Sequence, residues 1–93
     1  MTRVTMTDQP LGFVFPCSFP LKAFGQHRDD FEALVVSVVR RHVGVDEELV
    51  VSSRQSQGGR YLAVTVTFMA QSRQQLDGLY LELSQNERVL MTL

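Results

Sequence analysis

The chain has 93 residues, of which 44% are hydrophobic and 20% charged, which suits one globular domain with a modest core. Its formal net charge of -1 argues against a protein whose main task is to bind phosphates or an anionic membrane. The single cysteine, Cys17, excludes a disulfide framework within the chain, and no apolar run approaches the roughly 20 residues that span a bilayer. The first residues lack the apolar core and cleavage site of a signal peptide, so we expect a cytoplasmic protein with no membrane partner.

The N-terminal part of the chain predicts a leader followed by a strand. Residues 1–14 have no periodicity, and we expect a loose leader before a single domain over residues 15–93. Residues 15–25 then alternate as a strand does. Pro16 and Pro20 lack the N–H group that a strand ladder uses, so we expect only the later half to be well paired, with a turn at Gly25.

The next segment, residues 29–44, has the pattern of an amphipathic helix. Its apolar residues recur at i, i+3 and i+4 spacing from Phe31 onward, which places them on one stripe. Asp29 with Glu32 resembles a capping box at the start, and Gly44 is a candidate left-handed stop at the end.

The second half of the chain predicts two strands, a helix and a last strand. Residues 48–54 and 60–70 read as a hairpin joined at Gly58-Gly59, and the second of these strands alternates strictly between an apolar and a mixed face. Residues 72–84 form a helix that opens with the capping box Ser72 and Gln75. Gly78 within it indicates close approach to a neighbouring element, and residues 88–93 form the last strand.

The element order β-α-β-β-α-β indicates an α+β fold, the ferredoxin-like sandwich. We expect a four-stranded antiparallel sheet in the order 4-1-3-2 with both helices on one face. The other face would stay open, and its mixed surface would carry Phe24, Tyr61, Thr65, Thr67 and Met69.

Residues with catalytic or metal-binding chemistry do not form a recognisable set. His27 and His42 lie at opposite ends of the first helix, and there is no second thiol for Cys17, so we expect no metal and no cofactor. Cys17 lies on a proline-flanked strand, away from the helix N-terminus that would favour a reactive thiolate. The acidic residues Asp29 and Asp30 suit a helix start. We therefore expect no catalytic residues and no enzyme activity.

Two places remain as candidate binding sites. The loop Gly25-Gln26-His27-Arg28 precedes the first helix, where free N–H groups favour an anionic small molecule, although Asp29, Asp30 and Glu32 oppose an anion there. The open sheet face is the other candidate. Tyr61 and Phe24 would be stacking residues for single-stranded RNA, but a ring is missing at Ala63 and basic charge is sparse, which makes nucleic acid an unfavoured partner.

Several separated motifs resemble one bacterial family. They are Phe15-Pro16-Cys17, Lys22, Gly25, Arg41-His42, SQGGRY at 56–61, VTVTF at 64–68, SRQQLDGLYLEL at 72–83 and VLMTL at 89–93. In these the chain resembles the YbeD-like family of small bacterial proteins of unknown function. The resemblance implies a ferredoxin-like fold that is similar to ACT regulatory domains. In some genomes the genes of this family lie beside lipoate-attachment genes. It implies no catalytic residues.

Together these observations predict a non-enzymatic, ACT-like regulatory or adaptor domain that binds a small-molecule effector or a protein partner and is linked to lipoate metabolism. The alternative is single-stranded RNA binding through the open sheet face. The last strand, residues 88–93, would be a sheet edge with little charge, so we also expect weak homo-oligomers.

Overall fold

The computed structural model describes residues 14–93. The predicted leader over residues 1–14 therefore lies outside the described residues, apart from Val14. The elements follow in the order β1 (Cys17–Gln26), α1 (Phe31–His42), β2 (Val50–Gln55), β3 (Tyr61–Ala70), α2 (Arg73–Ser84) and β4 (Val89–Thr92). No helix in the described part of the chain is long and apolar enough to cross a membrane.

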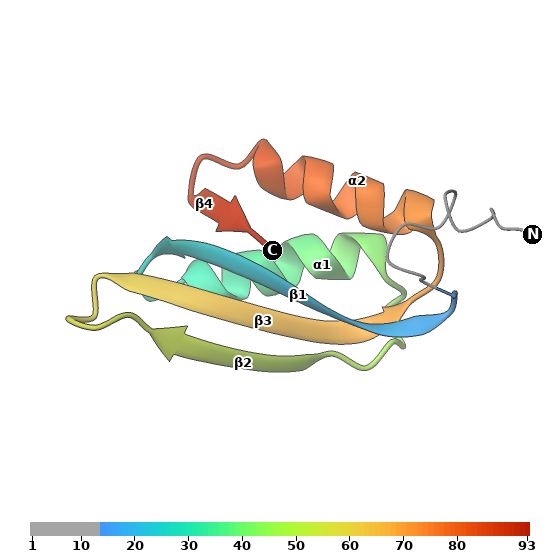
Figure 1. Ribbon diagram of the computed structural model, residues 1–93, viewed down its shortest axis with the longest axis horizontal. Coiled ribbons are helices and arrows are strands. Elements are labelled where there is room, and N and C mark those ends of the chain that lie inside the picture. The colour runs from blue at the N-terminus through green and yellow to red at the C-terminus, as the bar shows by residue number, and fades with distance from the viewer. Residues whose placement is uncertain (1–13) are drawn as a thin grey trace, which may run out of the picture.

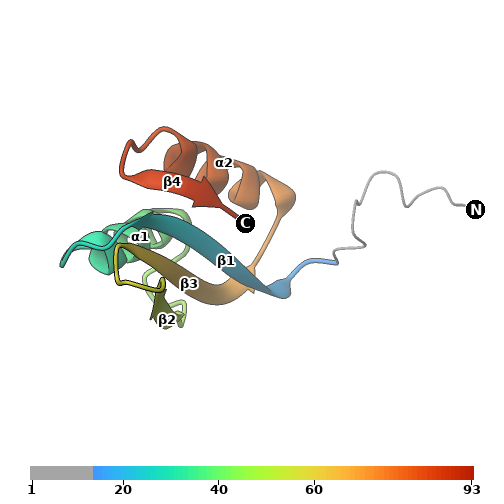
Figure 2. The same cartoon turned by 60° about the vertical axis from the view of Figure 1, so that its left-hand side comes forward.

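The strands form one antiparallel sheet in the order β2-β3-β1-β4, with β1 and β3 in the centre. Both helices lie on the same side of this sheet, and β4 lies below α2 beside β1 (Figures 1 and 2). The predicted α+β ferredoxin-like sandwich, its strand order and the placement of both helices are thereby confirmed.

The core lies between the sheet and the two helices. Alternate residues of β3 point toward the helices and are buried, as the strict alternation predicts. The core combines them with one stripe from each helix: Leu62, Val64, Val66 and Phe68 from β3, Phe31, Val35, Val38 and Val39 from α1, and Leu76, Leu79 and Leu83 from α2. Each fully buried aliphatic side chain of this kind contributes about 1.5–3 kcal/mol to the free energy of folding.

The prediction that only the later half of β1 is well paired was wrong. β1 pairs with β3 over its whole length, from Cys17 opposite Ala70 to Gln26 opposite Tyr61. The main-chain N–H and C=O groups of Lys22 bond to those of Leu93, the residue that follows β4, and in a strand the main-chain groups of every second residue face the same side. The nitrogen of Pro20 therefore faces the β4 side, where β4 has already ended, and no ladder bond to β3 is lost.

The predicted turn at Gly25 does not form, because β1 continues to Gln26. Gly25 is a buried β1 residue, and a Cβ built there would lie 2.5 Å from the ring of Phe31 and 2.6 Å from the carbonyl oxygen of Arg88. Opposite Gly25 the register on β4 shifts by one residue, which leaves Leu90 unpaired as a bulge between Val89 and Met91. Gly25 thus permits close packing within the fold.

The ends of α1 differ from the prediction. Asp30 is the N-cap residue and makes no side-chain capping bond, so the predicted box of Asp29 and Glu32 does not form. The carboxylate of Glu32 accepts a hydrogen bond from the Ser53 hydroxyl. At the other end the backbone leaves the helix in an extended conformation at Val43, without a left-handed residue at Gly44.

The predicted capping box of Ser72 and Gln75 forms in half, and the predicted connection at Gly58-Gly59 is confirmed. The Ser72 hydroxyl accepts the N–H of Gln75 at 3.1 Å, whereas the Gln75 side chain bonds to the N–H of Gln71 in place of that of Ser72. The Gln75 side chain also donates to the carbonyl of His42, so it links α2 to α1. Gly58 and Gly59 have φ angles of 89° and 76°, which suits the tight connection between β2 and β3.

Candidate functional site

The sheet face opposite the helices, here called the open face, brings the predicted surface residues together. It consists of every second residue of the strands: Ser18, Pro20, Lys22, Phe24 and Gln26 of β1, Val50, Ser52 and Arg54 of β2, Tyr61, Ala63, Thr65, Thr67 and Met69 of β3, and Met91 of β4. All five residues predicted for this face, from Phe24 to Met69, are among them.

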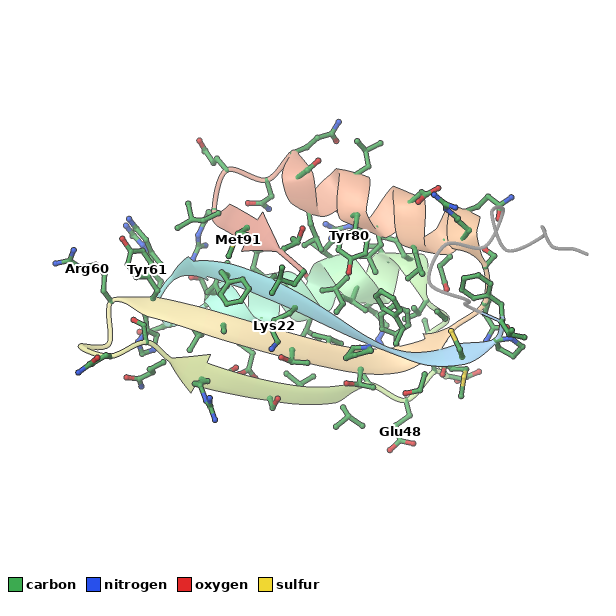
Figure 3. All side chains as sticks on the ribbon, viewed as in Figure 1. Lys22, Glu48, Arg60, Tyr61, Tyr80 and Met91 are labelled. Carbon is green, nitrogen blue, oxygen red and sulfur yellow. The ribbon has the colours of Figure 1, made fainter. Side chains whose placement is uncertain are left out.

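The register arranges the centre of the open face in rows across the sheet. One row runs from Met91 through Phe24 and Ala63 to Arg54. In the neighbouring row Lys22 lies opposite Thr65. A shallow hollow lies over both rows, between β1, β2 and β3. Figure 3 shows Lys22 over the central strands, Met91 beside them on β4 and Tyr61 at the hairpin end.

Several apolar side chains on the open face are in contact with solvent. The exposed fractions are 59% for Val50, 53% for Met91, 42% for Tyr61 and 40% for Met69. Single exposed apolar residues are common on protein surfaces, whereas apolar residues gathered on one face are typical of binding surfaces. The open face therefore has the apolar component of an interaction site.

The charged residues at the strand positions of the open face are both positive. They are Lys22 and Arg54, and no open-face strand position is occupied by Asp or Glu. Just outside the strands, Arg60 lies beside Tyr61 at the hairpin end, and Glu48 lies before the start of β2 (Figure 3). Within residues 14–93 the side chains of these three cations have no ion-pair or hydrogen-bond partner.

The remaining cations of residues 14–93 all have partners. Arg28 donates to Gln26, Arg41 to Glu82, and Arg40 to the carbonyls of Gly44, Val45 and Glu47. Arg73 lies 3.9 Å from Asp77, and Arg88 pairs with Asp30. Five of the eight lysine and arginine side chains of residues 14–93 thus make contacts inside the fold.

The loop predicted as a ligand site makes contacts within the protein. The His27 ring contacts the Gly59 carbonyl through Nδ1 at 3.1 Å, and its main-chain N–H donates to the Arg60 carbonyl at 2.8 Å. His27 therefore holds the loop against the hairpin. Gly25 lies beneath Phe31, so the close approach that its missing side chain permits is already made by the protein.

Gln26 and Arg28 line a polar hollow together with Asp30, Glu87 and Arg88. Arg88 donates two hydrogen bonds to the carboxylate of Asp30, at 2.9 and 2.7 Å, and these hold the pKa of Asp30 below its ordinary value. The two cations of this hollow are matched by two carboxylates. The structure thus places the residues of the predicted site at three different places: core, hairpin contact and hollow.

The other titratable residues act in contacts between elements. Glu82 of α2 accepts hydrogen bonds from Arg41 and lies 2.8 Å from the Nε2 atom of His42, and these bonds lower the pKa of Glu82. The Tyr80 hydroxyl donates to the Leu93 carbonyl at 2.8 Å, and burial raises the pKa of Tyr80. Among residues 14–93 no three potential metal ligands converge.

Val50 and Met91 of the open face could not be placed there from the sequence. Their positions depend on how β2 and β4 pair with the central strands, and only the register of the sheet reveals this. The alternation of β1 and β3 was enough to find the other residues.

A family model described as "Protein of unknown function (DUF493)" matches residues 12–93. The chain belongs to this family. Among its relatives, a UPF0250 protein of Chromobacterium violaceum is 48% identical over 81 residues, which cover 87% of this chain and 91% of that protein. A second, from Nitrosomonas europaea, is 36% identical over 88 residues, which cover 95% of this chain and 100% of that protein. The predicted resemblance to a small bacterial family of unknown function is confirmed.

A solved structure shares the fold. The solution structure of protein HP0495 from H. pylori has a TM-score of 0.72, covers 100% of this chain and 98% of its own, and is 11% identical in sequence. This likeness concerns the fold alone, that is, the arrangement of the strands and helices in residues 14–93.

Proposed function

We propose that this protein is a cytoplasmic, non-enzymatic regulatory or adaptor domain that binds a protein partner through the open face. The observation that carries the proposal is the row of Met91, Phe24 and Ala63 across the sheet centre, with exposed Tyr61 next to Ala63 on the same face of β3. Binding of a partner would remove these side chains from water and so contribute a hydrophobic driving force.

The proposed absence of catalysis is supported by the contacts of the groups that usually carry out acid–base chemistry. Glu82 is engaged by Arg41 and His42, and Asp30 is engaged by Arg88. His27 holds the loop after β1 against the hairpin. Each of these groups connects two elements of the fold, which is a structural task.

Photo-crosslinking in the native cell tests the proposal. A photoreactive amino acid replaces Thr65, at the centre of the open face, or Gln74, on the exposed side of α2 as the matched control. We expect a discrete, protease-sensitive product from position 65 that position 74 does not give. Equal products from both positions, or none from position 65, would contradict a protein partner on this face.

Binding of a small-molecule effector at the loop Gly25–Arg28 is the second candidate function. It is supported by the polar hollow beside Gln26 and Arg28, and opposed by the carboxylates of Asp30 and Glu87 in the same hollow. The link to lipoate metabolism rests on the family resemblance alone. Amide NMR titration with free lipoate and with amino acids tests both ideas, because shifts confined to the 25–28 amides would favour the effector.

Single-stranded RNA binding remains the alternative for the open face. It is supported by Phe24 and Tyr61 on adjacent central strands, with Lys22 and Arg54 nearby. Stacking platforms usually offer several rings, and Ala63 occupies the position next to Phe24 where another ring would be needed. An RNase-sensitive product in the crosslinking experiment would favour this alternative over a protein partner.

A further inference from the structure

The distribution of charge over the two sides of the protein indicates the chemistry of the partner. Of the eight lysine and arginine residues within residues 14–93, five are engaged by carboxylates, a side-chain amide or main-chain carbonyls of the protein itself. The three without such a partner are Lys22 and Arg54, on the open face, and Arg60 at its hairpin end.

The carboxylates have the opposite distribution. They lie on α1, on α2 and in the connections, at Asp29, Asp30, Glu32, Asp46, Glu47, Glu48, Asp77, Glu82 and Glu87. An overall charge close to zero thus conceals a positive open face and a more acidic helix side. Lone cations of this kind attract a complementary surface and disfavour a basic one.

We infer that the partner presents acidic side chains among apolar ones, as an acidic segment or surface of a protein. This inference rests on the proposed function. The apolar row from Met91 to Ala63 ends at Arg54, and Lys22 lies in the neighbouring row. An extended or helical segment lying across these rows would bury apolar side chains on Phe24 and Met91. Its carboxylates would meet Lys22 at the centre and Arg54 toward the β2 edge.

The apolar component distinguishes this partner from a nucleic acid. Met69 and Met91 offer flexible apolar contacts and Val50 a rigid one, and such contacts suit apolar side chains better than they suit stacked bases. Three cations are also few for a surface that must neutralise a phosphate backbone. An acidic, partly apolar protein surface makes use of both components of the open face.

Charge reversal combined with the crosslinking experiment tests the inference. With the photoreactive residue at position 65, we compare Lys22→Glu and Arg54→Glu with Arg73→Glu. Arg73 is exposed on α2, so its variant changes the net charge by the same amount on the other side of the protein. We expect crosslinking to fall by about tenfold or more in the open-face variants, and to persist in the Arg73 variant. Amide NMR spectra confirm that each variant is folded.

The outcomes separate the inference from the proposed function. If no protein is captured from position 65 in the unmodified background, the proposed function itself fails. If a protein is captured equally well after charge reversal at Lys22 and Arg54, the partner surface is not acidic, and the inference is overturned while the proposed function stands. A product that RNase removes would replace the acidic protein with RNA and overturn the inference as well.

Discussion

Asp30 and Arg88, 58 residues apart in the chain, form a two-point ion pair between the start of α1 and the turn before β4. The Nη1 and Nη2 atoms of Arg88 donate to the two carboxylate oxygens of Asp30 at 2.9 and 2.7 Å. The same Arg88 carries the main-chain carbonyl that lies against Gly25. One side chain and one carbonyl of Arg88 thus fix the position of this turn against β1 and α1.

We expect the Asp30–Arg88 pair to make stability depend on pH. The hydrogen bonds from Arg88 lower the pKa of Asp30 below its ordinary value of 3.8. A group whose pKa is lower in the folded state stabilises the fold above the unfolded pKa, and this contribution is lost as pH falls through the folded pKa. The stability difference between wild type and Asp30→Asn should therefore be present near neutral pH and shrink below about pH 4.

Urea midpoints measured at several pH values check this expectation. Asp29→Asn is the matched control, since it removes the same charge one residue away and leaves the pair with Arg88 in place. A loss of equal size in both variants at neutral pH would show that general charge near the helix start, rather than this ion pair, governs stability.

The core predicts a strong contrast between two positions of α2. Leu79 is fully buried beneath the sheet, so Leu79→Ala should lower the free energy of unfolding by about 2–5 kcal/mol, because it removes apolar contacts and leaves a cavity. Gln74 is exposed on the same helix, and Gln74→Ala should change it by less than about 0.5 kcal/mol. Chemical denaturation of both variants measures the difference, and equal midpoints would refute the placement of the core.

The strands, helices and strand order could be predicted from the sequence because they depend on periodicity. The alternation of β3 and the apolar stripes of the helices are properties of neighbouring residues. The errors concern Pro20, Gly25, Asp29 and Gly44. Whether Pro20 costs a ladder bond depends on where β4 ends, and whether Gly25 turns depends on Phe31, which lies above it. Such outcomes are decided by tertiary contacts.

The candidate site, like the fold, could be predicted from the sequence only where it depends on the alternation of residues along one strand. Alternation placed Phe24 and Tyr61 on one surface, but the row that joins Met91 to Arg54 follows from strand register. Within residues 14–93 the Lys22 side chain has no partner while that of Arg88 has one, and this also could not be seen in the sequence, since both are cations with acidic residues elsewhere in the chain. The charge pattern emerges only when the elements are packed.

Two glycines should respond in opposite ways to replacement by alanine. At Gly25 the new Cβ would lie 2.5 Å from the Phe31 ring and 2.6 Å from a main-chain oxygen, so we expect Gly25→Ala to destabilise the fold by about 1–3 kcal/mol. At Gly78, inside α2, the nearest atoms are in the His42 ring at 3.6 Å, an ordinary contact. Gly78→Ala should therefore stabilise the helix by about 0.5–1 kcal/mol.

Thermal and urea unfolding of the two alanine variants measure both changes. Because each variant adds one methyl group to a glycine, their difference reports the local environment. A destabilised Gly78→Ala variant would show that the His42 ring lies closer to the new Cβ than the 3.6 Å seen here. An unchanged Gly25→Ala variant would show that Phe31 moves aside easily.

The exposed edge of β4 leads us to expect weak self-association. As the end strand of the sheet, β4 has main-chain groups on its outer side without a neighbouring strand, and Leu90 on it is 58% exposed. β4 is only four residues long and contains a bulge, which should keep the association weak.

Leu90→Lys should shift the protein toward monomer, because a charged side chain on an edge strand opposes pairing with a second copy. Leu81→Lys is the matched control, since Leu81 on α2 is 59% exposed and lies away from the sheet edge. Sedimentation velocity over a series of protein concentrations compares the two variants with wild type. Wild type that stays monomeric at the highest concentrations, or equal loss of association in both variants, would show that this edge does not pair.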